Sequence, residues 1–204
     1  MITRLLLILF LSLTLSAKVL NSNMFVYHCE NDYDFVAEIN TNEAWLFLPS
    51  KTVKAKQVSS VEGSKYRVNE ILYWYKRDEA RLKIGTKKFH CKNDSVAAAF
   101  EKAKFEGVAF RAIGNEPDWI LEITADEKVV LITNHGESKI AFKVLEKFSD
   151  NVSTEYRLVS TYNTMYIRIE NRVCNDTMVD RIYDSTVYIN FDGVNMQGCG
   201  KSLF

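Results

Sequence analysis

Four cysteines are the residues whose type and number say most about chemistry. Cys29 and Cys91 lie in the first half of the 204-residue chain, and Cys174 and Cys199 lie in the second. An even number of cysteines in an exported chain indicates disulfides, whereas a zinc site requires clustered ligands, which the spacing does not provide. Four cysteines allow three pairings. We predict Cys29–Cys91 and Cys174–Cys199, because each pair would close one half of the chain and stabilise it by roughly 4 and 3.5 kcal/mol.

The other polar residues form no recognisable catalytic constellation. The sequence contains no Gly-x-Ser-x-Gly, no His-Glu-x-x-His and no glycine-rich phosphate loop, and its histidines are isolated from one another: His28, His90 and His135. Asp176, Asp180 and Asp184 lack the ligand spacing and glycine turn of a calcium loop, and we interpret them as a solvated acidic loop. We therefore predict no enzyme, no cofactor and no metal.

Composition excludes two broad classes of protein. The chain balances 26 Lys and Arg against 26 Asp and Glu, and 47% of its residues are hydrophobic. This apolar content is enough to build cores, so the chain is not disordered. A neutral charge balance also argues against a general nucleic-acid binder, which needs a broad cationic surface.

The first 17 residues are typical of a secretory signal peptide. Arg4 precedes the apolar run 5–11, and the small residues Ser16 and Ala17 suit a cleavage site. The run is shorter than the roughly 20 residues of a membrane-spanning helix. No cysteine lies at the cleavage site to carry a lipid, and the first cysteine, Cys29, is too far along the chain. We expect a periplasmic or secreted protein without a stable membrane anchor after cleavage. An uncleaved anchor is the alternative.

Short segments that alternate between polar and apolar residues must position any site. In residues 24–93 they are 25–27, 35–39, 44–48, 53–58, 71–75, 80–84 and 88–91. Several short strands at regular spacing predict an antiparallel sandwich or barrel. Because so few residues bury only a thin core, a disulfide between the first and last strands would stabilise this unit.

A helix and a second β-rich unit follow. Residues 94–104 can be capped by Asp94 or Ser95, and a stripe of apolar side chains should pack on a neighbour: Val96, Ala99, Phe100 and Ala103. Alternating segments resume at 108–112, 119–123, 128–132, 140–144, 156–159, 165–169 and 186–191. We predict a mainly β protein: a small antiparallel barrel at 24–93, a linking helix at 94–106 and a second antiparallel β domain at 107–204.

The first half carries a family resemblance. Tyr27-His28-Cys29 opens it, Lys88-Phe89-His90-Cys91 closes it, and 59–66 and 73–82 lie between them. This pattern resembles the bacterial membrane-bound or periplasmic inhibitors of c-type lysozyme. The resemblance implies a disulfide-closed β-barrel that inserts two loops into the lysozyme active-site cleft, where two carboxylates perform the glycosidic chemistry.

The resemblance also assigns roles to residues of the two loops. Lys76 falls at the cationic position that would pair with a catalytic carboxylate, Gly63 allows the turn of the first loop, and Tyr66 would brace that loop. Ser64 and Lys65 would supply hydrogen-bond donors. Glu62 stands where the family has serine and Arg77 where it has glycine. The alternative is that residues 73–75 merely flank a strand, with Lys76 solvated at its end.

The second half resembles an uncharacterised bacterial envelope domain. Residues 110–119, with Gly114-Asn115-Glu116-Pro117 as a turn and Trp119 as a core anchor, carry this resemblance together with the region around Cys174 and Cys199. It implies a location but no activity. The leading hypothesis is thus an inhibitor of c-type lysozyme or a related muramidase. An envelope scaffold or peptidoglycan-binding module is the second hypothesis, and a hydrolase in the second half is the third.

Overall fold

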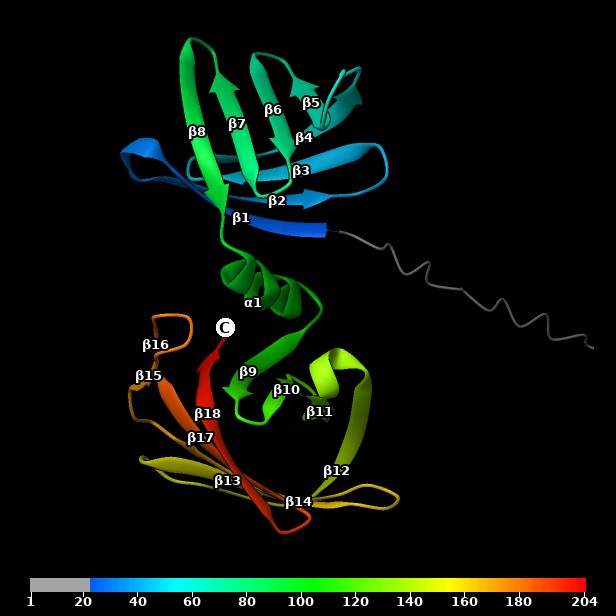
Figure 1. Cartoon of the computed structure of the whole chain (residues 1–204), viewed down its shortest axis with the longest axis vertical. Coiled ribbons are helices and arrows are strands. Elements are labelled where there is room, and N and C mark those ends of the chain that lie inside the picture. The colour runs from blue at the N-terminus through cyan, green and yellow to red at the C-terminus, as the bar shows by residue number, and fades with distance from the viewer. Residues whose placement is uncertain (1–22) are drawn as a thin grey trace, which may run out of the picture.

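The computed structural model describes residues 23–204 as two closed antiparallel β-barrels of eight strands each, with one helix between them (Figure 1). The fold class predicted from the sequence is confirmed. The predicted signal peptide at residues 1–17 lies outside the described residues. Within residues 23–204, no helix is both long enough and apolar enough to cross a membrane.

The first barrel is an up-and-down meander in which each strand pairs with the next and the last returns to the first. Its elements are β1 (Asn23–Cys29), η1 (Glu30–Asp32), β2 (Tyr33–Ile39), β3 (Glu43–Leu48), β4 (Lys51–Val58), β5 (Ser64–Val68), β6 (Ile71–Lys76), β7 (Glu79–Ile84) and β8 (Lys87–Asn93). The strand β5 was not predicted, because its residues were assigned to a loop.

Alternation along these strands sends one set of side chains into the barrel. Tyr27 and Tyr73 are fully buried there, and the Tyr73 hydroxyl donates a hydrogen bond of 3.0 Å to the Tyr27 hydroxyl. Burial raises the pKa of both hydroxyls above the ordinary value for tyrosine. Cys29 pairs with Cys91 across the β1–β8 junction, and the predicted disulfide joins them.

The helix α1 (Ser95–Phe105) follows β8 and lies between the barrels (Figure 1). The Asp94 carboxylate caps it by accepting a 2.9 Å hydrogen bond from the Ala97 N–H. Phe100 and Ala103 are buried, as the predicted apolar stripe requires, and Ala98 is buried where the stripe had Ala99. Phe100 packs on Tyr183 of the second barrel, with 5.6 Å between ring centroids.

The Asp94 side chain joins three parts of the molecule. Besides capping α1, its Oδ2 forms an ion pair with Arg181 of the second barrel and lies 3.3 Å from His28 Nε2 of β1. Burial alone would raise the pKa of this carboxyl, but the bonds from Arg181, the Ala97 N–H and His28 outweigh it and lower the pKa. The junction is therefore charged at neutral pH, and its contribution to stability is lost only as pH falls below about 4.

The second barrel repeats the meander with one insertion. Its strands are β9 (Val108–Asn115), β10 (Asp118–Thr124), β11 (Val129–Thr133), β12 (Ser138–Ser149), β13 (Ser153–Val159), β14 (Thr164–Glu170), β17 (Ser185–Phe191) and β18 (Val194–Ser202), with η2 (Asn134–Gly136) before β12. The strand β18 closes the barrel on β9.

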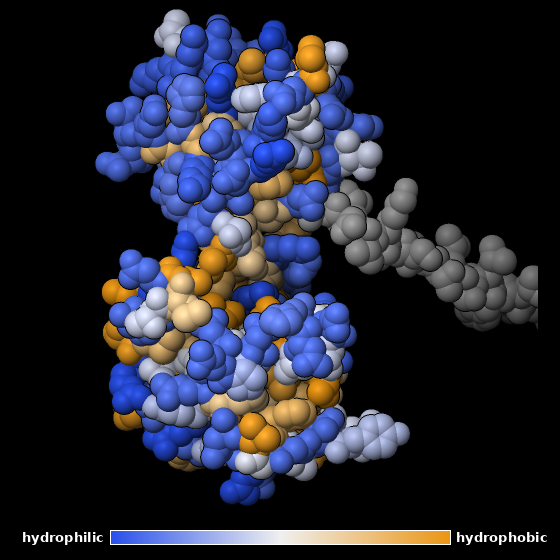
Figure 2. All heavy atoms as spheres, viewed as in Figure 1, coloured by the Kyte–Doolittle hydropathy of each residue, from blue (hydrophilic) through white to orange (hydrophobic). Residues whose placement is uncertain are grey.

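A small hairpin of β15 (Cys174–Asp176) and β16 (Arg181–Tyr183) is inserted between β14 and β17. The predicted disulfide Cys174–Cys199 fastens this hairpin to β18. The hairpin exposes apolar side chains, notably Met178 and Ile182, and hydrophobic surface gathers beside it at the waist between the barrels (Figure 2).

Trp119 anchors the core of the second barrel, as the sequence predicted. Its side chain is fully buried, and Gly114 and Gly198 leave the space that the indole occupies. A Cβ atom on either glycine would overlap the indole ring. The two glycines are thus required by packing.

We predict that Gly114→Ala destabilises the second barrel by about 1–3 kcal/mol, because the added methyl group overpacks the core. Denaturant unfolding followed by circular dichroism measures the change, because the test also replaces Trp119, the tryptophan of the second barrel. Trp119→Phe frees space, so the double variant should lose less stability than the two single changes combined. Additive losses would show that Gly114 and Trp119 do not share this space.

Candidate functional site

Two connections of the first barrel form the candidate site. Residues 59–63 join β4 to β5, and Arg77-Asp78 joins β6 to β7. The strands β5 and β6 are neighbours, with Ser64 opposite Tyr75, so the two connections lie side by side. In an up-and-down barrel alternate connections share one end. Both therefore emerge at the end from which the chain leaves β8 for α1.

An ion pair links the two connections directly. Glu62 in the first connection pairs with Lys76 at the end of β6. Both side chains are largely exposed, at 62% for Glu62 and 41% for Lys76. An exposed pair of this kind contributes about 0–1 kcal/mol. Lys76, the cation that the resemblance assigns to target binding, is therefore neutralised by Glu62 of the same chain, in a weak ion pair.

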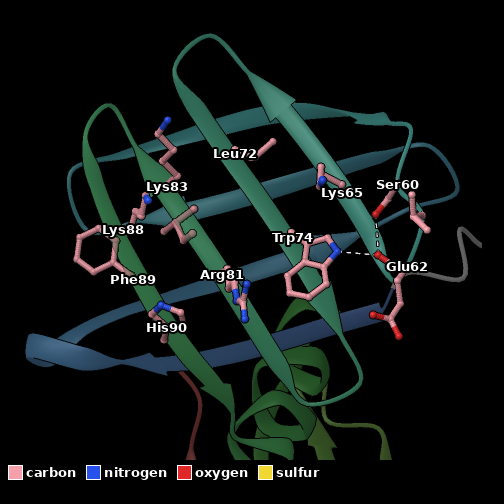
Figure 3. A pocket seen from close by; sticks show the side chains of 12 residues that line it. Ser60, Glu62, Lys65, Leu72, Trp74, Arg81, Lys83, Lys88, Phe89 and His90 are labelled. Atoms are coloured by element: carbon pink, nitrogen blue, oxygen red, sulfur yellow. Dashed lines mark hydrogen bonds between the residues drawn. The ribbon is translucent and has the colours of Figure 1, made fainter.

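Two hydrogen bonds fix the backbone beside this ion pair. The Glu62 carbonyl oxygen accepts bonds from Trp74 Nε1 at 2.7 Å and from Ser60 Oγ at 2.6 Å (Figure 3). Neither Trp74 nor Ser60 was among the predicted site residues. Alternation was the available signal for Trp74, because it lies between the inward-facing Tyr73 and Tyr75 and must point outward.

Two features of the backbone require glycine at position 63. Its φ of 65° lies in the left-handed region, and a Cβ atom there would collide with the Tyr75 carbonyl oxygen. The first connection thus runs tightly against β6. Arg77, in the second connection, also takes a left-handed φ of 56°, the conformation that glycine would favour. Arg77 thus takes a conformation that suits glycine, at the position where the family has glycine by resemblance.

Three predicted residues lie on β5 and not in a loop. Ser64, Lys65 and Tyr66 belong to this strand, so the assignment of 63–66 to a loop is wrong beyond Gly63. Tyr66 is buried at 2% exposure, and its ring lies 5.9 Å from that of Tyr73. It supports the first connection from within the core. Lys65 points outward opposite Trp74.

The tip of the first connection carries an exposed apolar residue. Val61 is fully exposed and lies between Ser60 and Glu62, whose backbone is anchored as described above. A well-held loop that presents an apolar tip has the features of a contact surface.

In the second barrel the predicted acidic loop is only partly solvated. Asp176 is buried at 6% exposure, and its Oδ1 accepts hydrogen bonds from Asn115 Nδ2 at 3.1 Å and from the Met178 N–H at 3.0 Å. The prediction of a solvated loop is thus wrong for Asp176, which holds the β15–β16 hairpin to the β9–β10 turn. Across residues 23–204, no three His, Cys, Asp or Glu side chains are placed to hold a metal ion.

The motif at residues 110–119 is used largely for packing. Arg111 forms an ion pair with Glu122 directly across β9–β10 and lies 5.5 Å over the Phe100 ring of α1. Burial lowers the pKa of Arg111, although Glu122 opposes the shift. The Arg111–Phe100 contact joins the second barrel to α1, whereas Gly114 and Trp119 pack on each other inside the barrel.

The first barrel thus combines a closed sheet, a disulfide across its seam and two adjacent connections. Residues 27–88 match the model of a family described as membrane-bound lysozyme-inhibitor of c-type lysozyme. The resemblance predicted for the first half is confirmed by this match, which lies within the first barrel. Residues 107–204 fall outside it, so their resemblance to an envelope domain stays a prediction. No curated protein and no solved structure matches the chain significantly.

We predict that Gly63→Ala destabilises the first barrel by more than about 1 kcal/mol, since it combines left-handed strain with a backbone collision. Gly85→Ala is the matched control, because Gly85 has a φ of 58° and its nearest contact would be the Glu70 carboxylate at 3.5 Å. Thermal unfolding of both variants separates strain from collision. Equal losses would contradict the tight approach of the loop to β6.

Proposed function

We propose that this chain is an exported inhibitor of c-type lysozyme that inserts residues 59–63 and 77–78 into the active-site cleft. The family match over residues 27–88 is the observation that carries the proposal. The geometry supports it, because both connections lie side by side at one end of a rigid barrel. Each is held in place, one by the Glu62 carbonyl bonds and the other by the tight β6–β7 turn.

Charge supplies the recognition. The cleft of a c-type lysozyme contains two carboxylates, and Lys76 is the cation that the two connections offer to them. A charge-assisted hydrogen bond in a desolvated cleft is stronger than the exposed pair with Glu62. Lys76 can therefore exchange Glu62 for a lysozyme carboxylate at small cost. Val61 would enter the cleft as the apolar tip.

Glu62 limits the affinity of this arrangement in our account. Its carboxylate competes for Lys76 in the free protein and faces the carboxylates of the target in the complex. Serine, which the family has at this position by resemblance, would do neither. The chain would thus be a weakened member of its class, or one tuned to a target whose cleft tolerates a carboxylate.

The proposal includes export of the protein from the cytoplasm. Both cysteine pairs are oxidised, which suits the periplasm or the exterior of a cell. The apolar segment near the N-terminus would direct the chain there.

Lys76→Ala should weaken inhibition of c-type lysozyme by roughly thirtyfold or more, because a desolvated charge pair loses one partner. A dose–response assay with the oxidised protein measures the change. Lys147→Ala removes an ion-paired lysine from the second barrel and should leave inhibition unchanged. Equal potency of the Lys76 variant and wild type would exclude Lys76 from the contact.

Glu62→Ser should strengthen inhibition, by up to about tenfold, since it frees Lys76 and removes a like charge from the cleft. The matched control is Glu146→Ser, which breaks an exposed ion pair with Arg157 on the second barrel. Weaker inhibition by the Glu62 variant would mean that this carboxylate contacts the target favourably.

A further inference from the structure

The outer face of β5–β8 has a composition that the inhibitor proposal leaves unexplained. Residues 64–93 carry nine Lys and Arg but only three Asp and Glu, although the whole chain is neutral. Strand register places one row of outward side chains across the four strands. This row consists of Lys65, Trp74, Arg81 and His90.

A second row lies beside the first and is more strongly cationic. It consists of Arg67, Leu72, Lys83 and Lys88. Lys83 and Lys88 are directly opposite one another and exposed, an arrangement that destabilises a sheet when no anion compensates it. Within residues 23–204, no ion pair neutralises any cation of the two rows. We refer to both rows together as the basic face.

A shallow pocket of about 570 Å³ lies on the basic face. Trp74 forms one wall, with the Arg81 guanidinium 5.1 Å from its ring centroid, and Leu72 adds apolar surface (Figure 3). Lys83 and Lys88 also line the pocket. Phe89, His90 and part of the first connection, including Glu62, whose carboxylate is paired with Lys76, also line it. The site thus combines aromatic side chains, a little apolar surface and convergent cations, which is the usual make-up of a small-ligand site.

We propose that the basic face binds an anionic sugar chain. The Trp74 ring offers a flat, electron-rich surface to the C–H face of a sugar ring. Lys83 and Lys88 would pair with carboxylates on that ring and its neighbour. These carboxylates would relieve the repulsion between the two lysines. This function uses cations other than Lys76 and goes beyond lysozyme inhibition, although Trp74 also anchors the first connection through Glu62.

Two other polyanions fit the basic face less well. Single-stranded nucleic acids are bound by successive stacking aromatic side chains along a groove, whereas the two rows offer Trp74 and the imidazole of His90, with Arg81 between them. Membrane surfaces are bound by several apolar side chains that protrude, whereas Val61 alone among the residues that line this pocket is a fully exposed apolar side chain, and Trp74 and Leu72 are partly buried. A carboxylated oligosaccharide matches both the shape and the charge.

Fluorescence titration with hexagalacturonate at low ionic strength tests the proposal, because Trp74 reports directly on the pocket. We expect saturable binding that added salt weakens. The double variant Lys83→Gln/Lys88→Gln should lower the affinity for hexagalacturonate by about tenfold or more. Lys139→Gln/Lys143→Gln on β12 removes the same charge from exposed positions of the second barrel and should leave the affinity unchanged. Trp74→Phe should abolish most of the fluorescence response.

Neutral chitohexaose, single-stranded DNA and anionic phospholipid vesicles serve as comparison ligands. Each should bind more weakly than hexagalacturonate. Absence of hexagalacturonate binding, equal weakening by both lysine pairs, or tighter binding of any comparison ligand would overturn the proposal. The titration contains no lysozyme, so its outcome is independent of the inhibitor proposal. Conversely, Lys83→Gln/Lys88→Gln should inhibit lysozyme as wild type does.

Discussion

Closure of the first barrel is the constraint on which the candidate site depends. The strand β8 must return to β1 for the sheet to have no free edge, and the Cys29–Cys91 disulfide lies at this seam. Because consecutive strands alternate in direction, the connections 59–63 and 77–78 share one end of the sheet, and closure turns that sheet into a barrel. A barrel of this size has a thin core, so the disulfide contributes substantially to the rigidity that the two connections need.

The same end of the barrel leads into α1, and α1 is attached to the second barrel. Asp94 ties α1 to β1 through His28 and to the β15–β16 hairpin through Arg181. Phe100 is packed between Tyr183 and the Arg111 guanidinium. A lysozyme molecule seated on the two connections would approach on the side of α1, so the second barrel can restrict the orientation in which a target binds.

Much of this fold was predictable from the sequence, because it depends on alternation along each strand. The helix after Asp94 and the core position of Trp119 followed from local patterns. Both disulfides followed from the expectation that each pair closes one half of the chain. The strand β5 was missed because Ser64, Lys65 and Arg67 are polar and face outward or lie at its start. The burial of Asp176 depends on Asn115, which is distant in sequence. The Glu62–Lys76 pair follows only from the β5–β6 register, which no local pattern reveals.

The central claim is that this chain occupies the substrate cleft of c-type lysozyme. The most direct test is steady-state hydrolysis of a soluble oligosaccharide by lysozyme at increasing concentrations of the oxidised protein. The account predicts competitive inhibition, in which the apparent KM rises with inhibitor concentration and kcat stays constant. A fall in kcat at constant KM, or no inhibition at micromolar protein, would contradict it.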